Sequence, residues 1–346
     1  MTRIVLVTGV SGDLAAHHAR ELVADPSVDK VVGIDVVPPR RDLGGVKFVR
    51  ADIRSPVIGK VLAVEEIDTV AHLALQSAPR PGSSTSVKET NVIGTMQLLA
   101  ACQRAPAVRR LVLKSSAAVY GSSPRDPAKF TEEMVARRSP RGGFAKDVLE
   151  VEGYVRGLAR RRPELEVTTL RLANLLSATW DSSLSRYFRL PVIPTVLGYD
   201  PRLQLLHPDD ALGVLRRAVL GDATGTFNVA GAGILMLSQA IRRLGRPSVP
   251  LPGFALASSG QSLLRPLGMQ VPPNLASYLS YGRGLDTTKL EQTLGWTPSH
   301  STADTLDEFI LSMPPSSITA DRLEAAQERL LGARHGQNVE AGARHG

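Results

Sequence analysis

The first residues able to do chemistry form a glycine-rich turn near the start of the chain. Gly9, Gly12 and Ala15 are spaced three apart, directly after the apolar run 4–7 and at the start of a helix pattern. A helix start presents free backbone N–H groups and the positive end of the helix dipole, and glycine lets an anion approach closely. This strand–turn–helix unit therefore favours a pyrophosphate, with the small Ala15 placed where helix and strand must pack together.

An acidic residue follows at the distance that a dinucleotide site requires. The next apolar strand, residues 31–34, ends in Asp35, about 20 residues beyond the glycine turn. A carboxylate there accepts hydrogen bonds from a ribose 2′-hydroxyl and disfavours a 2′-phosphate. We therefore predict a dinucleotide site that prefers NAD over NADP, although Arg40 and Arg41 lie close enough to keep NADP open.

The composition is that of an ordinary globular protein, with 346 residues, 43% apolar and 21% charged. The single Cys102 excludes an intrachain disulfide and no Cys/His cluster has zinc spacing, so we expect a cytoplasmic location and a metal-free site. We expect neither an export signal nor a membrane span. The net charge of +8 comes from scattered arginines without interleaved aromatic residues, which argues against nucleic acid and favours an anionic small molecule.

Strand-length apolar segments alternate with helix patterns along most of the chain. Strands are expected around 3–7, 31–34, 46–49, 69–73, 110–115, 167–171 and 226–229, and helices around 86–104, 144–160 and 209–220. This alternation predicts an α/β fold, a doubly wound parallel (Rossmann) sheet over residues 1–176, to which 205–232 return. The alternation breaks at 177–204 and 233–316, where we expect a smaller, mixed C-terminal substrate lobe. The tail, residues 317–346, is expected to be partly disordered.

A series of short motifs over residues 1–312 resembles the extended short-chain dehydrogenases/reductases, in the NAD-dependent sugar-nucleotide epimerase/dehydratase branch that includes UDP-glucose 4-epimerase. The motifs are Thr8-Gly-Val-Ser-Gly-Asp-Leu-Ala15, Asp35, Asp52-Ile53, His72-Leu-Ala74, Asn91 followed by Val-Ile-Gly-Thr95, Ser115-Ser-Ala-Ala-Val-Tyr-Gly121, Leu170-Arg-Leu-Ala-Asn174, His207-Pro-Asp-Asp210 and Gly225-Thr-Phe-Asn-Val229. The resemblance implies NAD as cofactor and a nucleotide sugar as substrate. It also implies a homodimer, built on the helices at 86–104 and 144–160.

The same resemblance assigns roles to individual residues. The cofactor would contact Gly9, Ser11, Gly12, Asp13, Leu14, Asp35, Asp52, Ile53, Leu73, Ala74, Asn91, Ser115 and Lys146. Ser116 and Lys146 would be catalytic, and Ser116 and Asn174 would contact the sugar and the phosphates of the substrate. Arg186 and Arg202, in loops of the second lobe, are candidate bidentate donors to a pyrophosphate.

One departure from the family pattern affects catalysis. The family places a tyrosine four residues before the lysine, but here that position is Gly142, and no Tyr-x-x-x-Lys occurs anywhere in the chain. In the family the tyrosine takes the proton from the reacting hydroxyl, its phenol acidified by the lysine. Losing such acid–base help costs roughly 10²- to 10⁴-fold in rate. Tyr120 and Tyr154 are candidate replacements, although a structural role suits each of them better.

Two histidine positions favour structural interpretations. His72 ends an apolar strand, which is typical of a hydrogen-bonded core histidine. His207, Asp209 and Asp210 resemble a metal cluster, but they directly precede a helix, where carboxylates commonly act as caps.

Two classes of function remain open from the sequence. The first is an enzyme that borrows and returns the hydride of NAD while acting on a nucleotide sugar. The second is a non-catalytic NAD(H)-binding regulatory or scaffold protein, which Gly142 favours. A lipid-linked or steroid-like alcohol is a further substrate class. Arginines facing the cleft after residue 177 would indicate a nucleotide substrate, whereas an apolar pocket would indicate a lipid and a filled one a regulator.

Overall fold

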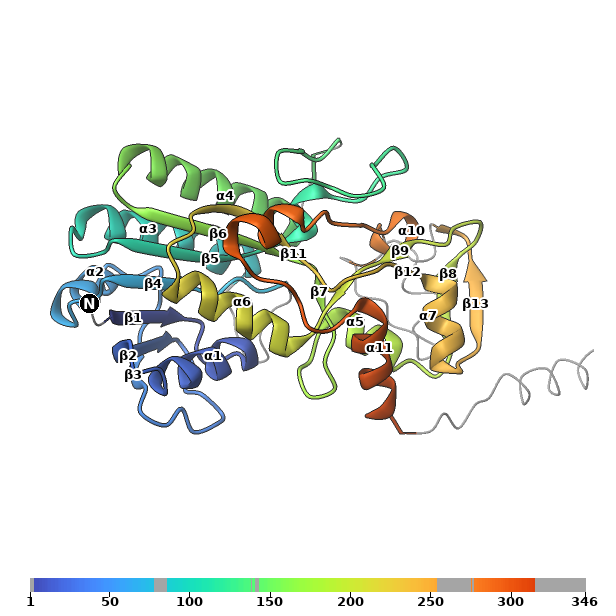
Figure 1. Cartoon of the computed structure of the whole chain (residues 1–346), viewed down its shortest axis with the longest axis horizontal. Coiled ribbons are helices and arrows are strands. Elements are labelled where there is room, and N and C mark those ends of the chain that lie inside the picture. The colour runs from blue at the N-terminus through green and yellow to red at the C-terminus, as the bar shows by residue number, and fades with distance from the viewer. Residues whose placement is uncertain are drawn as a thin grey trace, which may run out of the picture.

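A seven-stranded parallel sheet forms the centre of the first lobe, in the order β11-β6-β5-β4-β1-β2-β3 (Figure 1). The structure, a computed structural model, describes residues 3–77, 86–137, 139–140, 143–253, 275 and 277–314. The sheet strands are β1 (Arg3–Thr8), β2 (Val28–Asp35), β3 (Lys47–Arg50), β4 (Thr69–His72), β5 (Arg110–Ser116), β6 (Glu166–Leu172) and β11 (Gly225–Val229). The winding direction reverses between β1 and β4, which is where doubly wound sheets bind ligands. The predicted doubly wound parallel sheet is confirmed.

Helices cover both faces of this sheet, which explains the continuous apolar runs in its strands. Helices α1 (Asp13–Val23) and α6 (Pro208–Leu220) pack together on one face, and α2 (Val57–Val64), α3 (Thr95–Arg104) and α4 (Gly143–Arg161) lie on the other (Figure 1). In α4, Val148, Val151, Val155 and Leu158 recur every three or four residues and are buried, so this spacing fixes the inward face of the helix. A π-helical turn, Glu89–Gly94, leads into α3.

The second lobe has a hydrophobic core of its own. Three of its aromatic residues, Tyr187, Phe188 and Phe309, are fully buried together with aliphatic side chains from 176–205 and 237–244. The elements around this core are α5 (Ser183–Phe188), α7 (Leu237–Leu244), α10 (Tyr278–Tyr281) and α11 (Thr302–Leu311), with the strand pairs β7 (Asn174–Leu175) and β10 (Leu205–Leu206), β9 (Arg202–Leu203) and β12 (Leu235–Met236), and β8 (Ile193–Val196) and β13 (Ser248–Leu251).

One segment assigned above to the second lobe packs on the first core instead. Leu285, Leu290 and Leu294 all belong to the core of the sheet lobe. The backbone explains this, because Phe130 donates to Gly284 at 2.9 Å and accepts from Asp286 at 2.8 Å, which carries the chain back to the sheet lobe. Gly142 and the tail 317–346 lie outside the described residues. Across the described residues, no helix combines the length and the apolarity that crossing a membrane requires.

Two histidines are fully buried in the sheet lobe. His72 shares hydrogen bonds with Thr8 at 2.7 Å and with Thr95 at 2.8 Å, so the prediction of a hydrogen-bonded core histidine is confirmed. His18 lies on the inner face of α1, and its ring nitrogens have no hydrogen-bond partner among the described residues. Burial lowers the pKa of both rings from 6.5 to about 3. Both rings are therefore almost entirely neutral in the folded protein at pH 5 and above.

These pKa values predict acid sensitivity. The unfolded chain takes up a proton at each histidine below pH 6.5 and the folded chain does not, so the free energy of unfolding decreases as pH falls, by about 2 kcal/mol per histidine at pH 5. His18→Leu removes one of the two groups without leaving a polar atom unpaired. Urea denaturation at pH 7 and pH 5 should show a smaller loss in this variant, by about 2 kcal/mol. An unchanged difference between the two pH values would contradict the assignment.

Candidate functional site

The glycine turn after β1 is shaped by close backbone contacts. Gly9 has φ of +74°, and a Cβ atom there would lie 2.6 Å from Ala74 Cα, so only glycine fits. The amide of Gly12 donates to the Gly9 carbonyl at 2.9 Å and closes the turn. Gly12 has ordinary extended geometry, and a Cβ atom there would meet only the Gly9 oxygen, at 3.4 Å. Gly9 is thus required by the fold, whereas the bare Cα of Gly12 leaves room for a ligand.

The start of α1 suits the diphosphate of a dinucleotide. The helix begins at Asp13 with Gly12 as its N-cap residue, and no described side chain caps it. Its first-turn N–H groups, including those of Asp13 and Leu14, therefore have no acceptor within the helix and point toward the turn. Ala15 is buried, as the packing of helix against strand requires.

Carboxylates lie beside this turn at the ends of β2 and β3. Asp35 is buried and accepts hydrogen bonds from the amides of Ser11 at 3.1 Å and Val36 at 2.7 Å, which fixes its position next to the turn. Asp52 is held by the Arg54 guanidinium, with Nη2 to Oδ2 at 2.7 Å, and these hydrogen bonds lower the pKa of Asp52. Both carboxylates lie where the adenosine half of a dinucleotide is predicted, and their cofactor roles stay predictions.

Asn91 fixes the loop that follows β4. Its carboxamide accepts from the Gln76 amide at 3.0 Å and donates to the Gln76 carbonyl at 2.9 Å. The Leu73 amide donates to the Thr8 hydroxyl at 3.1 Å, which ties the start of the same loop to β1. Since Asn91 is fully buried, it can influence a cofactor only through the loop that carries Leu73 and Ala74. Ile53 is likewise buried.

A buried ion pair joins α4 to the sheet. Arg171 donates two hydrogen bonds to Glu152, at 2.7 and 3.0 Å, and Ser115 donates to the same carboxylate. Burial opposes the charge of Arg171, but the hydrogen bonds and charge of Glu152 raise the pKa of the guanidinium overall. Arg171 also donates to the Tyr120 hydroxyl at 2.7 Å. The Ser115 side chain is therefore part of this network. Only the backbone of Ser115 is available for the predicted cofactor contact.

Ser116 and Lys146 lie on neighbouring elements. Ser116 ends β5 and accepts from the Ala118 amide at 3.2 Å, which starts the 3₁₀ turn Ala117–Tyr120. Helix α4 packs against this turn and carries Lys146 in its first turn. The Lys146 ammonium is partly exposed and lies 3.8 Å from Glu150. The catalytic roles of both residues stay predictions, because Gly142 lies outside the described residues.

Neither candidate tyrosine is placed as a replacement base. The Tyr120 hydroxyl donates to Asn228 at 2.7 Å, and burial raises the pKa of its phenol. Tyr120 is therefore a structural residue, as expected. Tyr154 is exposed and follows Lys146 by eight residues, about 12 Å along α4.

Asn174 lines a small hollow next to Ser116. The other residues around it are Ala117, Ala173, Gln204, Tyr278, Arg283 and Leu285. Arg283 donates to the Gly121 carbonyl at 2.9 Å and to the Ser122 hydroxyl at 3.1 Å, so a cation lies beside the turn that follows β5. Burial raises the pKa of Tyr278, and the neighbouring Asn174 side chain opposes that shift.

The sequence analysis missed Arg283. The glycines on both sides of Arg283 are a signal that the sequence does carry. The structure gives the reason for Gly282, which has φ of +66° and whose Cα packs against the Arg202 backbone, where a side chain would collide. The flanking glycines of Gly282-Arg-Gly284 thus mark a close approach. Arg202 lies on β9 beside this segment, whereas Arg186 is exposed and pairs with Asp181 at 3.3 Å. Contacts of Arg186 and Arg202 with a pyrophosphate stay predictions.

The sequence predicts that carboxylates cap the start of α6, but the structure shows a different cap. His207 is the N-cap residue, and its Nδ1 accepts from the Asp209 amide at 3.2 Å. Asp210 turns away from the helix start and accepts from the amides of Ser299 at 2.8 Å and His300 at 3.0 Å. The predicted carboxylate cap was therefore wrong, because Asp210 accepts hydrogen bonds from a loop about 90 residues later in the chain instead.

Comparisons with known proteins bear on the family and the fold of this chain. The model of the NAD dependent epimerase/dehydratase family matches residues 5–192. An uncharacterized protein of Mycobacterium tuberculosis is 48% identical over 312 residues, 89% of this chain and 83% of the relative. The UDP-glucose 4-epimerase of Lactobacillus helveticus is 26% identical over 87% of this chain and 93% of its own length. The crystal structure of dTDP-glucose 4,6-dehydratase from Bacillus anthracis, in complex with NAD, shares the fold with a TM-score of 0.68 at 16% identity, over 90% of this chain and 96% of that one.

The two glycines should respond differently to substitution. Gly12→Ala fits the fold but places a methyl group where a diphosphate must approach, so NAD affinity should fall at least about tenfold, or 1.4 kcal/mol, at unchanged stability. Gly9→Ala should lower the free energy of unfolding by about 1–3 kcal/mol, because of its positive φ and the contact with Ala74. Calorimetric titration with NAD and urea denaturation separate the two effects. If Gly12→Ala binds NAD as tightly as the wild type, the diphosphate does not lie against Gly12.

Proposed function

Since the chain belongs to the NAD-dependent epimerase/dehydratase family, we propose that it binds NAD at the β1–α1 turn and acts on a nucleotide sugar beside Ser116. The uncapped start of α1 beside Asp35 is the observation that supports this proposal most directly. NAD, when bound, supplies a nicotinamide ring that accepts a hydride and can return it. The remaining steps depend on side chains of the chain itself.

Each group near the turn has a definable task in this proposal. The free N–H groups of Asp13 and Leu14 hold the diphosphate, and Asp35 accepts from the adenosine ribose. Lys146 contacts the nicotinamide ribose, and Ser116 holds the hydroxyl of the sugar that reacts. Ser116 is already positioned for this by the 3₁₀ turn that its own oxygen caps.

The substrate side of the site contains groups suited to phosphates. Asn174 supplies a carboxamide donor, and Arg283 supplies a guanidinium that is held over the Tyr278 ring, 5.6 Å from its centroid. A guanidinium that is fixed in this way loses little side-chain entropy when it pairs with a phosphate. A nucleotide sugar is therefore favoured over a lipid-linked or steroid-like alcohol. The similarity to the Lactobacillus helveticus UDP-glucose 4-epimerase over nearly its full length supports oxidation and reduction of the sugar ring.

The proton transfer is the step for which the chain lacks the family's usual group. Gly142 occupies the tyrosine position, Tyr120 is buried in a network, and Tyr154 lies far along α4. We therefore propose slow or atypical catalysis. A non-catalytic NAD(H)-binding regulatory or scaffold protein is the second candidate, and Gly142 is the observation that favours it.

A tyrosine at position 142 should distinguish these two candidates. If the site lacks only its base, Gly142→Tyr should raise epimerase or dehydratase turnover on a UDP- or dTDP-sugar by roughly 10²- to 10⁴-fold. Gly142→Phe is the matched control, because it adds the ring without the hydroxyl. Native mass spectrometry of the purified protein identifies any NAD or nucleotide sugar that it carries. A protein that binds NAD, turns over no nucleotide sugar and gains nothing from Gly142→Tyr would be the regulator.

We also propose that the chain forms a homodimer through α3 and α4. The two helices pack side by side. Large apolar side chains remain exposed on them and on the π-helical turn before α3, namely Met96, Tyr154 and Ile93. Two such pairs would form a four-helix bundle, as the family resemblance implies. For the location of the protein we propose the cytoplasm, where the free and buried Cys102 would remain reduced.

Oligomeric state tests the dimer directly. Light scattering at micromolar concentration should give twice the mass of the chain, from an interface of more than about 1,000 Å². Met96→Glu should shift the protein to monomers because it buries an unpaired charge at the interface. Val64→Glu, at an exposed position of α2, is the control and should remain dimeric. A monomeric wild-type protein would refute the proposal.

A further inference from the structure

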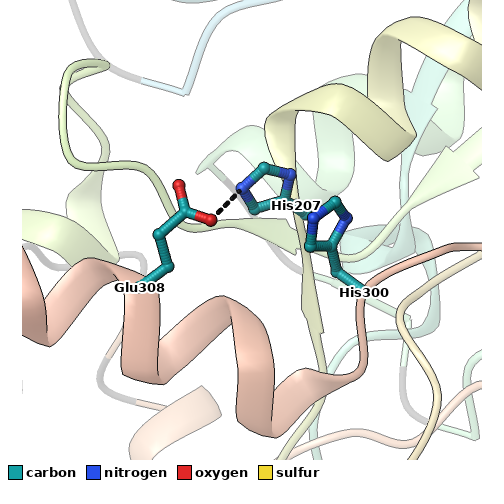
Figure 2. A group of neighbouring side chains, drawn as sticks. All are labelled: His207, His300 and Glu308. Atoms are coloured by element: carbon teal, nitrogen blue, oxygen red, sulfur yellow. Dashed lines mark ion pairs between the residues drawn. The ribbon is translucent and has the colours of Figure 1, made fainter.

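Two histidines and a glutamate from distant parts of the chain meet beside the start of α6. His207 ends the segment after β10, His300 lies in the loop before α11, and Glu308 is on α11. The three side chains face one another, with the Glu308 carboxylate 3.2 Å from His207 Nε2 (Figure 2). The imidazole rings stack with centroids 3.9 Å apart. One ligand atom from each residue lies within 4.8 Å of the other two.

Each imidazole has a carboxylate beside its Nδ1 atom. His300 Nδ1 lies 3.1 Å from the buried Asp210 Oδ2, and His207 Nδ1 lies 3.8 Å from Asp209 Oδ2. Metal-bound histidines commonly donate their second ring N–H to a carboxylate, which orients the ring and makes it a better ligand. Asp210 is thus in place to orient the His300 ring, and the Asp209 carboxylate lies near His207 Nδ1. Both Nε2 atoms face the Glu308 side of the cluster (Figure 2).

We propose that His207 Nε2, His300 Nε2 and the Glu308 carboxylate bind a zinc ion. Two histidines and a carboxylate are a known zinc ligand set, with water in the fourth position. Bonds of 2.0–2.1 Å in tetrahedral geometry place ligand atoms about 3.3 Å apart. The His207–Glu308 separation of 3.2 Å is close to this value, and the exposed Glu308 is free to adjust further. The two rings must turn out of their stacked arrangement before both Nε2 lone pairs point at one ion.

Zinc binding would change the proton and one hydrogen bond of His207. In the zinc-free protein His207 Nδ1 accepts from the Asp209 amide, so its proton is on Nε2 and points at Glu308. When zinc takes Nε2, that proton moves to Nδ1, which gives up the Asp209 amide and must turn toward the Asp209 carboxylate, 3.8 Å away, to find an acceptor. His300 already donates from Nδ1 to Asp210, so its Nε2 is the unprotonated atom.

The proposed ion would connect the two lobes. Helix α6 packs in the core of the sheet lobe, through Leu212 and Leu215 among others, while Leu306 and Phe309 of α11 belong to the core of the second lobe. A zinc ion shared by His207 and Glu308 therefore acts as a cross-link across the boundary. This role is independent of the nucleotide-sugar chemistry, because it concerns residues outside the glycine turn and the Asn174 hollow.

Zinc binding to the untagged, chelator-treated full chain tests the proposal. Calorimetric titration with zinc chloride should give one ion per chain, and zinc should raise the melting temperature. His300→Gln and Glu308→Gln should each weaken binding by about 100-fold or more and remove the thermal shift. Asp210→Asn should weaken binding by roughly 10- to 100-fold, as expected for a group that orients a ligand.

Matched controls separate this site from other zinc-binding groups. Asp307→Asn removes the neighbouring carboxylate of α11, which pairs with Arg243, and should leave zinc affinity unchanged. A His335→Gln/His345→Gln double variant removes the histidines of the tail and should also bind zinc normally. Unchanged melting temperatures of the zinc-free variants show that the substitutions leave the fold intact. The proposal is overturned if the wild-type protein binds no zinc, or if His300→Gln and Glu308→Gln bind it as tightly as the wild type.

Discussion

The position of the candidate site depends on the buried ion pair between Glu152 and Arg171. Arg171 is part of β6 and Glu152 is part of α4, so the pair sets the height of α4 over the sheet. Breaking a buried pair by removing one partner leaves an unpaired charge in the core, which is strongly destabilising. Lys146 lies in the first turn of α4, and Ser116 directly follows Ser115 of β5, whose hydroxyl donates to the same Glu152 carboxylate. The relative positions of Lys146 and Ser116 thus depend on the Glu152–Arg171 ion pair, which lies deeper in the core.

The polar network around this pair continues toward the second lobe. Tyr120 connects Arg171 to Asn228 on β11, and Asn228 in turn donates to the carbonyls of Phe130 at 2.9 Å and Asp286 at 3.2 Å. Buried polar groups are tolerated when each finds a partner, and such networks specify one arrangement of their elements. Hydrogen bonds from the sheet lobe therefore hold the segment that carries Arg283 in place beside the hollow.

The two lobes also meet on the far side of β10, at the histidine cluster. A hydrogen bond or a shared ion there restrains α11 against α6, whereas the Asn228 network restrains the 285–294 segment. Ligands of doubly wound sheets bind at the carboxyl ends of the strands. The restraints on the second lobe thus determine how closely its groups can approach a substrate at that edge. The NAD site and the proposed metal site therefore lie at different places on the boundary between the two lobes.

The sequence by itself determined the doubly wound sheet, because buried parallel strands are continuous apolar runs and amphipathic helices have a fixed period. It also determined the glycine turn and Asp35, which depend on residues close along the chain. Only the tertiary structure placed Arg283 beside Asn174 and joined His207 to His300 and Glu308, and it returned 285–294 to the first core. These contacts join residues about 90 to 160 positions apart in the chain, and local patterns carry no information on which distant side chains meet, since packing and partner availability decide it.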